Sequence, residues 1–262
     1  MASKSADEMV SCIMDENSIP DVPLQKYYSL KWFIHALKND RFIFQKPSTW
    51  ADPFEDFISK LTNNKASIVN GLNITDDIFA MSTINKKSEC DGMWNNFAKK
   101  NGVLIHTSSR KILNSLVSFL MANGCCRNSK VYLNGYDVLR TFAENIKIEK
   151  ITYATDKKIA EFFKNLTNIS TIPNEYNRIR FEALSLKRTE YDYESEYRVF
   201  IVPKRLNLTE KRYLDAGYFK QTISKITLSP SASTIRINRL NNLLIKKYGI
   251  DPNIIEQSDL YK

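Results

Sequence analysis

The sequence predicts an α+β fold in which two small mixed or antiparallel sheets pack face to face, with helices on the outside. Short runs of β-branched and aromatic residues alternate with segments of helical period, and the connections between them are short. One run, Tyr197 to Val202, is almost continuously apolar, which is typical of a central strand buried on both faces. No repeat or Pro/Gly-rich linker interrupts the 262 residues, which favours a single domain over 1–262 with a helical lead-in at 1–20.

Periodicity and helix-stopping residues give the elements of the N-terminal part. The helix at 30–38 has Trp32 and Leu37 among its apolar positions and stops at Asn39-Asp40. Asp52, followed by proline, is a good N-cap, and Glu55 completes a capping box, so both have a sufficient structural role. The expected elements, in order, are a helix at 6–16, a strand at 24–28, a helix at 30–38, a strand at 41–45, a helix at 52–61 and a strand at 78–81.

The same signals continue through the rest of the chain. Asn101-Gly102 predicts a left-handed cap at the end of a helix over 91–100. The remaining expected elements are a strand at 103–106, a helix at 110–123, a strand at 148–154, helices at 157–166 and 174–185, strands at 197–202 and 223–228, and a helix at 233–248.

The charge balance points to a polyanionic partner. The chain carries 38 Lys and Arg against 29 Asp and Glu, a formal net charge of +9. That excess suggests nucleic acid or a phosphate-rich cofactor. The alternative is a solvated lysine-rich surface, because the lysines are spread along the chain. With seven glycines, the sequence has no phosphate-cradling loop of the dinucleotide or P-loop type.

Several functional classes have no support in the sequence. No apolar run approaches the ~18 residues of a membrane helix, and the first residues lack the apolar core of a signal peptide. The four cysteines form no Cys-x-x-Cys pair, so we expect free thiols in a reducing cytoplasm. No motif indicates a zinc site or a Ser-His-Asp triad. We therefore expect a cytoplasmic protein that needs neither a membrane nor a metal.

The start of the 197–202 strand carries an unusual group of charges. Strand alternation would direct Glu194, Glu196 and Arg198 to the same face. Two carboxylates and a guanidinium are costly to bury unless they pair or face a cleft. We predict that Arg198 lies within salt-bridge distance of Glu194 or Glu196. The group is either a site of acid/base or electrostatic chemistry or a structural ion pair.

Other polar and aromatic residues form further candidate binding groups. Lys26 and Tyr28 together can hold a phosphate and a ring, or can belong to an edge strand. The Ser82-Thr83 pair, expected where a strand ends, can hydrogen-bond a ribose or cap the next segment. Trp94 shares a helix face with Phe97, which favours core packing, although its ring could also form the wall of a flat ligand site.

Four motifs together resemble those of the bacterial family called domain of unknown function 2971, over about residues 24–250. That family has a Tyr-Lys-Tyr-like strand, Asn-Asp-Pro-Phe-Glu, Met-Trp-x-x-Tyr-Ala, and a Lys and an aromatic before Tyr-Glu-x-Glu-aromatic-Arg. The segments here are Lys26-Tyr27-Tyr28, Ala51-Asp52-Pro53-Phe54-Glu55, Met93-Trp94-Asn95-Asn96-Phe97-Ala98, and Lys187 and Tyr191 before Tyr193-Glu194-Ser195-Glu196-Tyr197-Arg198. The departures are Ala51 for Asn, Phe97 for Tyr and Tyr191 for Trp.

The order of the motifs also resembles that of ADP-ribosyltransferases, and this second resemblance implies a function. Those enzymes have an opening strand with a cationic or aromatic residue, a Ser-Thr-Ser strand end and a final Glu-x-Glu strand. Ile84 stands here in place of the second Ser. The resemblance implies an ADP-ribosyltransferase-like fold that uses NAD as a substrate and holds it with side chains.

The implied roles are specific to each residue. Glu196 would stabilise the ribosyl cation formed when nicotinamide leaves, as in glycoside hydrolysis. Glu194 would position or deprotonate the acceptor, which would be a nucleic acid or a protein. The implied cofactor-binding residues are Lys26 at the pyrophosphate, Tyr28 or Trp94 at a ring, Ser82 or Thr83 at a ribose, and Arg198.

Three functions follow from these observations. The first is an ADP-ribosyltransferase-like enzyme, with a role as a bacterial toxin or phage-defence effector suggested by the setting of the family. The second is a non-catalytic module that binds nucleic acid or a protein, with the charged group purely structural. The third is a metal-dependent nuclease that uses Asp52, Glu55, Glu194 and Glu196 as oxygen ligands.

Overall fold

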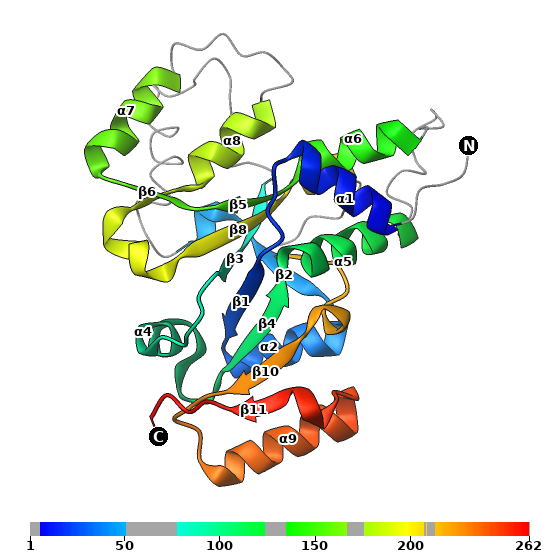
Figure 1. The fold of residues 1–262 in the computed structure, drawn as a ribbon, viewed down its shortest axis with the longest axis vertical. Coiled ribbons are helices and arrows are strands. Elements are labelled where there is room, and N and C mark those ends of the chain that lie inside the picture. Colours follow the sequence, from blue (N-terminus) through cyan, green and yellow to red (C-terminus); the bar gives the residue numbers. More distant parts are fainter. Residues whose placement is uncertain are drawn as a thin grey trace. The chain divides into compact units, whose positions relative to one another are not determined.

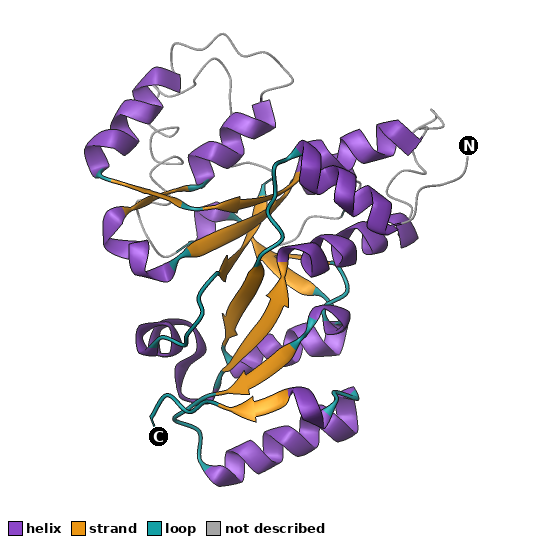
Figure 2. Cartoon of the chain, in the orientation of Figure 1, coloured by secondary structure: helices purple, strands orange, loops and turns teal. Residues whose placement is uncertain are grey.

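The computed structural model describes residues 6–50, 78–123, 135–166, 176–206, 208 and 213–261. These residues form an α+β structure with a mixed β-sheet and several helices (Figures 1 and 2). The predicted α+β class is therefore confirmed. The arrangement as two small packed sheets of ADP-ribosyltransferase type stays a prediction, and the helix expected at 52–61 lies outside the described residues. Within the described ranges, no helix has both the length and the apolar character needed to cross a bilayer.

The chain divides into two compact units, and each is built from several separate segments. The first unit comprises Met1–Ile19, Ile43–Ser82 and Leu120–Leu214, and the second comprises Pro20–Phe42, Thr83–Phe119 and Asp215–Lys262. The division falls inside β2 (Phe42–Gln45), β3 (Phe79–Ile84), α5 (Ser109–Ala122) and β9 (Tyr213–Ala216).

The first unit is organised around strand β8 (Glu196–Ile201). This strand pairs antiparallel with β5, and it also pairs with β3. All six residues of β8 are buried, as the apolar run predicted. The core beside β8 includes Phe181 stacked on Phe200, with ring centroids 5.2 Å apart. The α-helices and strands that lie wholly within this unit, besides β8, are α1 (Ala6–Glu16), α6 (Gly135–Asn145), β5 (Ile146–Lys150), β6 (Thr152–Ala154), α7 (Asp156–Leu166), α8 (Tyr176–Leu184) and β7 (Leu186–Arg188).

The second unit contains four neighbouring strands in the order β11-β10-β4-β1. β1 (Pro23–Tyr28) and β10 (Lys225–Leu228) both pair antiparallel with β4 (Val103–Ser108). β11 (Ile255–Gln257) runs parallel to β10, because α9 (Thr234–Tyr248) returns the chain to the same end of the sheet. α2 (Leu30–Asn39) stops where Asp40 adopts a left-handed conformation at φ 50°, as expected.

The segment before β4 differs from the predicted helix. α4 (Asp91–Met93) is a single short turn, and it continues as a π-helix over Trp94–Ala98 and a 3-10 turn over Lys99–Asn101. Gly102 has φ −81°, so it is not the left-handed cap that the sequence predicted. Glycine is required at this position for a different reason, which is the close approach of two backbone oxygens. A Cβ atom at Gly102 would lie 2.2 Å from the carbonyl oxygen of Ala98 and 2.3 Å from that of Tyr28.

We predict that Gly102→Ala destabilises the protein by ~2 kcal/mol or more, because the two nearest atoms that the new methyl group would meet are backbone oxygens that cannot rotate away. Gly92→Ala is the matched control, since the nearest atom to a Cβ there is the Cys90 Sγ at 3.9 Å. Urea unfolding followed by circular dichroism measures both variants. Equal unfolding midpoints for Gly102→Ala and wild type would contradict the close approach.

Candidate functional site

Glu196 and Arg198 form a buried, two-pronged ion pair in the first unit. Arg198 Nε lies 2.7 Å from Glu196 Oε1, and Arg198 Nη2 lies 3.2 Å from Glu196 Oε2. The side chain of Glu196 is 3% exposed, and that of Arg198 is 1% exposed. The two residues are two apart on β8, so alternation places them on one face, and the predicted salt bridge is confirmed.

Two further contacts hold the guanidinium of Arg198. Its Nη1 donates a hydrogen bond of 2.6 Å to the carbonyl oxygen of Leu184, at the end of α8. Its Cζ lies 4.2 Å from the centre of the Trp50 ring, a cation–π contact. A charge buried this deeply requires such partners, because each unmet hydrogen bond of a charged group is costly.

Lys187 is the member of the cluster to which the sequence assigned no role. Its Nζ lies 2.7 Å from Glu194 Oε2 and 3.0 Å from Glu196 Oε2, so one ammonium joins the two carboxylates. The same Nζ lies 4.9 Å from the centre of the Tyr191 ring. Lys187 belongs to β7, and its side chain is buried. We call the four residues Lys187, Glu194, Glu196 and Arg198 the ion cluster.

The placement of Glu194 corrects the alternation argument. Glu194 ends a 3-10 helix over Thr189–Glu194, and Ser195 then adopts φ 50° before β8 begins at Glu196. Glu194 is therefore not on the strand and does not share its face by alternation. It reaches the ion cluster through Lys187, because the turn at Ser195 brings the end of the 3-10 helix back beside the strand.

The ion cluster keeps Glu196 ionised. Burial alone raises the pKa of Glu196, but Arg198, Lys187 and a hydrogen bond from the Ser82 hydroxyl outweigh it and lower the pKa to about 2. The Tyr153 hydroxyl accepts a 2.9 Å hydrogen bond from the Glu196 backbone N–H. Burial raises the pKa of Tyr153 to about 12. The cluster has two carboxylates and two cations, so these formal charges cancel at neutral pH.

The other predicted site residues belong to the second unit. Lys26 Nζ lies 5.1 Å from the centre of the Tyr28 ring. Tyr28 is buried against Phe33 and Phe219, and burial raises the pKa of its hydroxyl. Thr83 is buried as well.

Trp94 is a core residue of the second unit. It is 2% exposed, its ring meets Tyr27 edge-on at 5.1 Å, and its Nε1 donates to Glu89 Oε2 at 2.8 Å. Neither Trp94 nor Tyr28 presents an exposed ring face, so stacking on a ligand would require each of them to move.

The structure thus brings together part of the predicted site. Glu194, Glu196, Arg198 and Ser82 belong to the first unit, and Lys26, Tyr28, Thr83 and Trp94 belong to the second. A single cleft that collects both sets stays a prediction. Among the described residues, no group of three or more His, Cys, Asp or Glu side chains could hold a metal ion. Asp52 and Glu55, the other proposed nuclease ligands, lie outside the described residues.

We predict that Arg198→Ala lowers the free energy of unfolding by ~3 kcal/mol or more. The buried Glu196 carboxylate would lose its guanidinium partner, and Lys187 alone would offset only part of the cost of burying that charge. Arg140→Ala is the control. It removes an exposed pair with Glu144, whose side chains are 56% and 48% exposed, and such pairs contribute well under ~1 kcal/mol. Thermal melts of the two variants measure the difference. A melt of Arg198→Ala that matches wild type would reject the role of the ion pair.

We also predict a pH dependence that belongs to Glu196. Its pKa is lower in the folded protein than its ordinary value of 4.5, so its stabilising contribution is present above pH ~4.5 and is lost as pH falls toward 2. The stability difference between wild type and Glu196→Gln should therefore shrink by roughly 3 kcal/mol across that window. Urea unfolding at a series of pH values tests this. A difference that stays constant from pH 6 to about 2 would mean that the carboxylate is not held ionised.

Comparison with known proteins does not identify the chain. No family model matches the sequence, and no curated protein and no solved structure matches it significantly. The resemblances to domain of unknown function 2971 and to ADP-ribosyltransferases therefore stay predictions that rest on the motifs themselves.

Proposed function

We propose that this protein is an ADP-ribosyltransferase-like enzyme that breaks the nicotinamide–ribose bond of NAD, with Glu196 as the key carboxylate. The observation that carries the proposal is the pairing of Glu196 with Ser82, a residue of the neighbouring strand β3. The two motifs were assigned to one site from their order in the sequence alone. A hydrogen bond between them inside one unit supports that assignment.

The chemistry needs a fixed negative charge beside the ribose. When the C1′–N bond breaks, its electron pair leaves with nicotinamide, and the ribose carbon becomes an oxocarbenium-like cation. A preorganised carboxylate lowers the energy of that cation without having to reorient. A pKa of about 2 supports this role, because Glu196 is then ionised at any physiological pH. Water or an acceptor then attacks C1′ and gives up a proton, for which Glu194 is the proposed base.

The ion cluster sets a condition on this mechanism. Both oxygens of Glu196 accept hydrogen bonds from cations, which reduces the field that they exert on a ligand. Lys187 lies closer to Glu194 than to Glu196, at 2.7 Å against 3.0 Å. We infer that Lys187 moves wholly onto Glu194 when NAD binds, so that Glu196 Oε2 keeps its 3.2 Å bond to Arg198 and has a lone pair available for the ribose.

A non-catalytic module is the second candidate, and the burial of the ion cluster favours it. The side chain of Glu196 is only 3% exposed, and a fully paired cluster needs no function beyond holding β8 in place. The net charge of +9 would then serve a polyanionic or protein partner. The metal-dependent nuclease has less support, because Glu194 and Glu196, two of its proposed ligands, are already paired with Lys187 and Arg198.

The deciding experiment measures NAD binding by calorimetry and nicotinamide release by chromatography, for wild type and Glu196→Gln. The variant keeps the shape of the side chain and loses its charge. We predict that NAD still binds to the variant while turnover falls by ~100-fold or more, the scale of losing one preorganised electrostatic contact. EDTA should change neither protein, whereas the nuclease candidate predicts loss of activity with EDTA.

Glu144→Gln is the matched control, because Glu144 is an exposed carboxylate that pairs with Arg140 and is not a member of the ion cluster. Its turnover should equal that of wild type. All assays run below the melting temperature of Glu196→Gln, so that unfolding does not imitate a catalytic defect. If wild type neither binds NAD nor releases nicotinamide, even with cell extract added as a source of acceptors, the enzyme hypothesis is rejected in favour of the non-catalytic module.

A further inference from the structure

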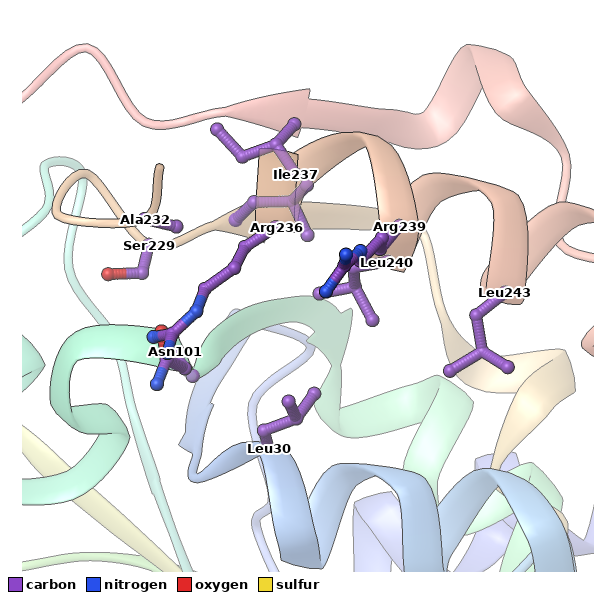
Figure 3. A pocket seen from close by; sticks show the side chains of 11 residues that line it. Leu30, Asn101, Ser229, Ala232, Arg236, Ile237, Arg239, Leu240 and Leu243 are labelled. Atoms are coloured by element: carbon purple, nitrogen blue, oxygen red, sulfur yellow. The ribbon is translucent and has the colours of Figure 1, made fainter. Parts of the chain in front are cut away.

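A pocket of about 360 Å³ lies in the second unit, among α2, the end of β10, the segment before β4, and α9. Its volume is within the range of small-molecule sites. Leu240 and Leu243 extend from α9 toward Leu30 at the start of α2, as Figure 3 shows. Leu228 of β10 and Ile237 of α9 add to the apolar lining. Leu240 and Leu243 are partly exposed, whereas Leu244 is the buried residue of α9.

Two arginines line the same pocket. Arg236 extends from α9 to Asn101, and its Nη1 donates a hydrogen bond to the Asn101 side-chain oxygen (Figure 3). That bond fixes the position of one guanidinium. Arg239 lies one turn further along α9, and no described residue forms an ion pair or a hydrogen bond with it. The α9 sequence contains no Asp or Glu, so no residue of this helix balances the two charges.

The lining identifies the class of ligand. Among the residues that the structure describes, no aromatic side chain lines the pocket, so these residues offer no surface for stacking a base or a nicotinamide ring. Its aliphatic side chains suit a hydrocarbon, and guanidinium forks suit a carboxylate or a phosphate. We propose that this pocket binds a small amphipathic anion, whose aliphatic body packs on Leu30, Leu240 and Leu243 and whose carboxylate or phosphate head meets Arg236 and Arg239. The proposal does not rest on the proposed NAD chemistry.

The test uses four probes that share a ten-carbon chain: decanoate, decyl phosphate, decanol and decyltrimethylammonium, each below its micelle concentration. Calorimetry measures binding to the full chain, and a thermal melt measures the stabilisation that a ligand of the folded state must give. Decanoate or decyl phosphate should bind and raise the melting temperature, and the tighter of the two identifies the head group. Decanol and decyltrimethylammonium should bind at least ~10-fold more weakly, because they cannot pair with a guanidinium.

Two variants locate the binding site. Arg236→Gln with Arg239→Gln should weaken binding of the anionic probe by ~10-fold or more. Leu240→Trp should abolish it by filling the pocket, while the melting temperature without ligand stays near that of wild type. The matched control is Lys246→Gln with Lys247→Gln, which removes the same charge from the same helix at residues that do not line the pocket.

The control variant should bind the anionic probe as wild type does. Equal weakening by the lysine and arginine pairs would mean that the probe responds only to the general charge of α9, and it would overturn the proposal. Equal binding of decanol and decanoate would also overturn it, because the arginines would then not contribute to recognition of the anionic head group. So would the absence of binding by both anionic probes.

Discussion

The buried ion pair between Arg198 and Glu196 is the interaction on which the first unit depends. β8 pairs on both sides and all six of its residues are buried, so its charges have no access to bulk water. Two ions in such a place are tolerated only when hydrogen bonds meet nearly all of their polar atoms. Arg198 has two further contacts, a hydrogen bond to the Leu184 carbonyl at the end of α8 and a cation–π contact with the Trp50 ring. The packing of separate segments around β8 is thus tied to one guanidinium.

Local sequence patterns were sufficient for the strongly periodic elements. The apolar run of β8, the helix stop at Asp40 and the long helix α9 all appear close to their expected positions. Elements of weak local pattern were not anticipated. β7, β9 and β11 are only three or four residues long. Strands this short are defined by the neighbour that they pair with, and a neighbour distant in the chain leaves no local trace. α6 was missed for another reason, since Leu139, Phe142 and Ala143 do recur at helical spacing.

The candidate site shows the same division between local and long-range information. Alternation places Glu196 and Arg198 together because both lie on one strand. It fails at Glu194, where Ser195 turns the chain, and it cannot find Lys187, which arrives from a different strand. Helical spacing gave no means of separating Trp94 as a ligand wall from Trp94 as a core residue. A large aromatic on a helix has the same pattern in either role, and only its burial distinguishes them.

The charges at the start of β8 also bear on how the chain folds. β8 pairs with β3, and the segment of chain between Ile84 and Glu196 is long, so bringing the two strands together costs more entropy than closing a short loop. Until that ladder forms, an otherwise apolar strand has an unpaired edge, which is a template for aggregation. In that interval Glu196 and Arg198 remain hydrated, and a second chain would have to strip their water before pairing there. Glu196 and Arg198, which are costly to bury in the native state, therefore hinder the unpaired strand from pairing with a second chain.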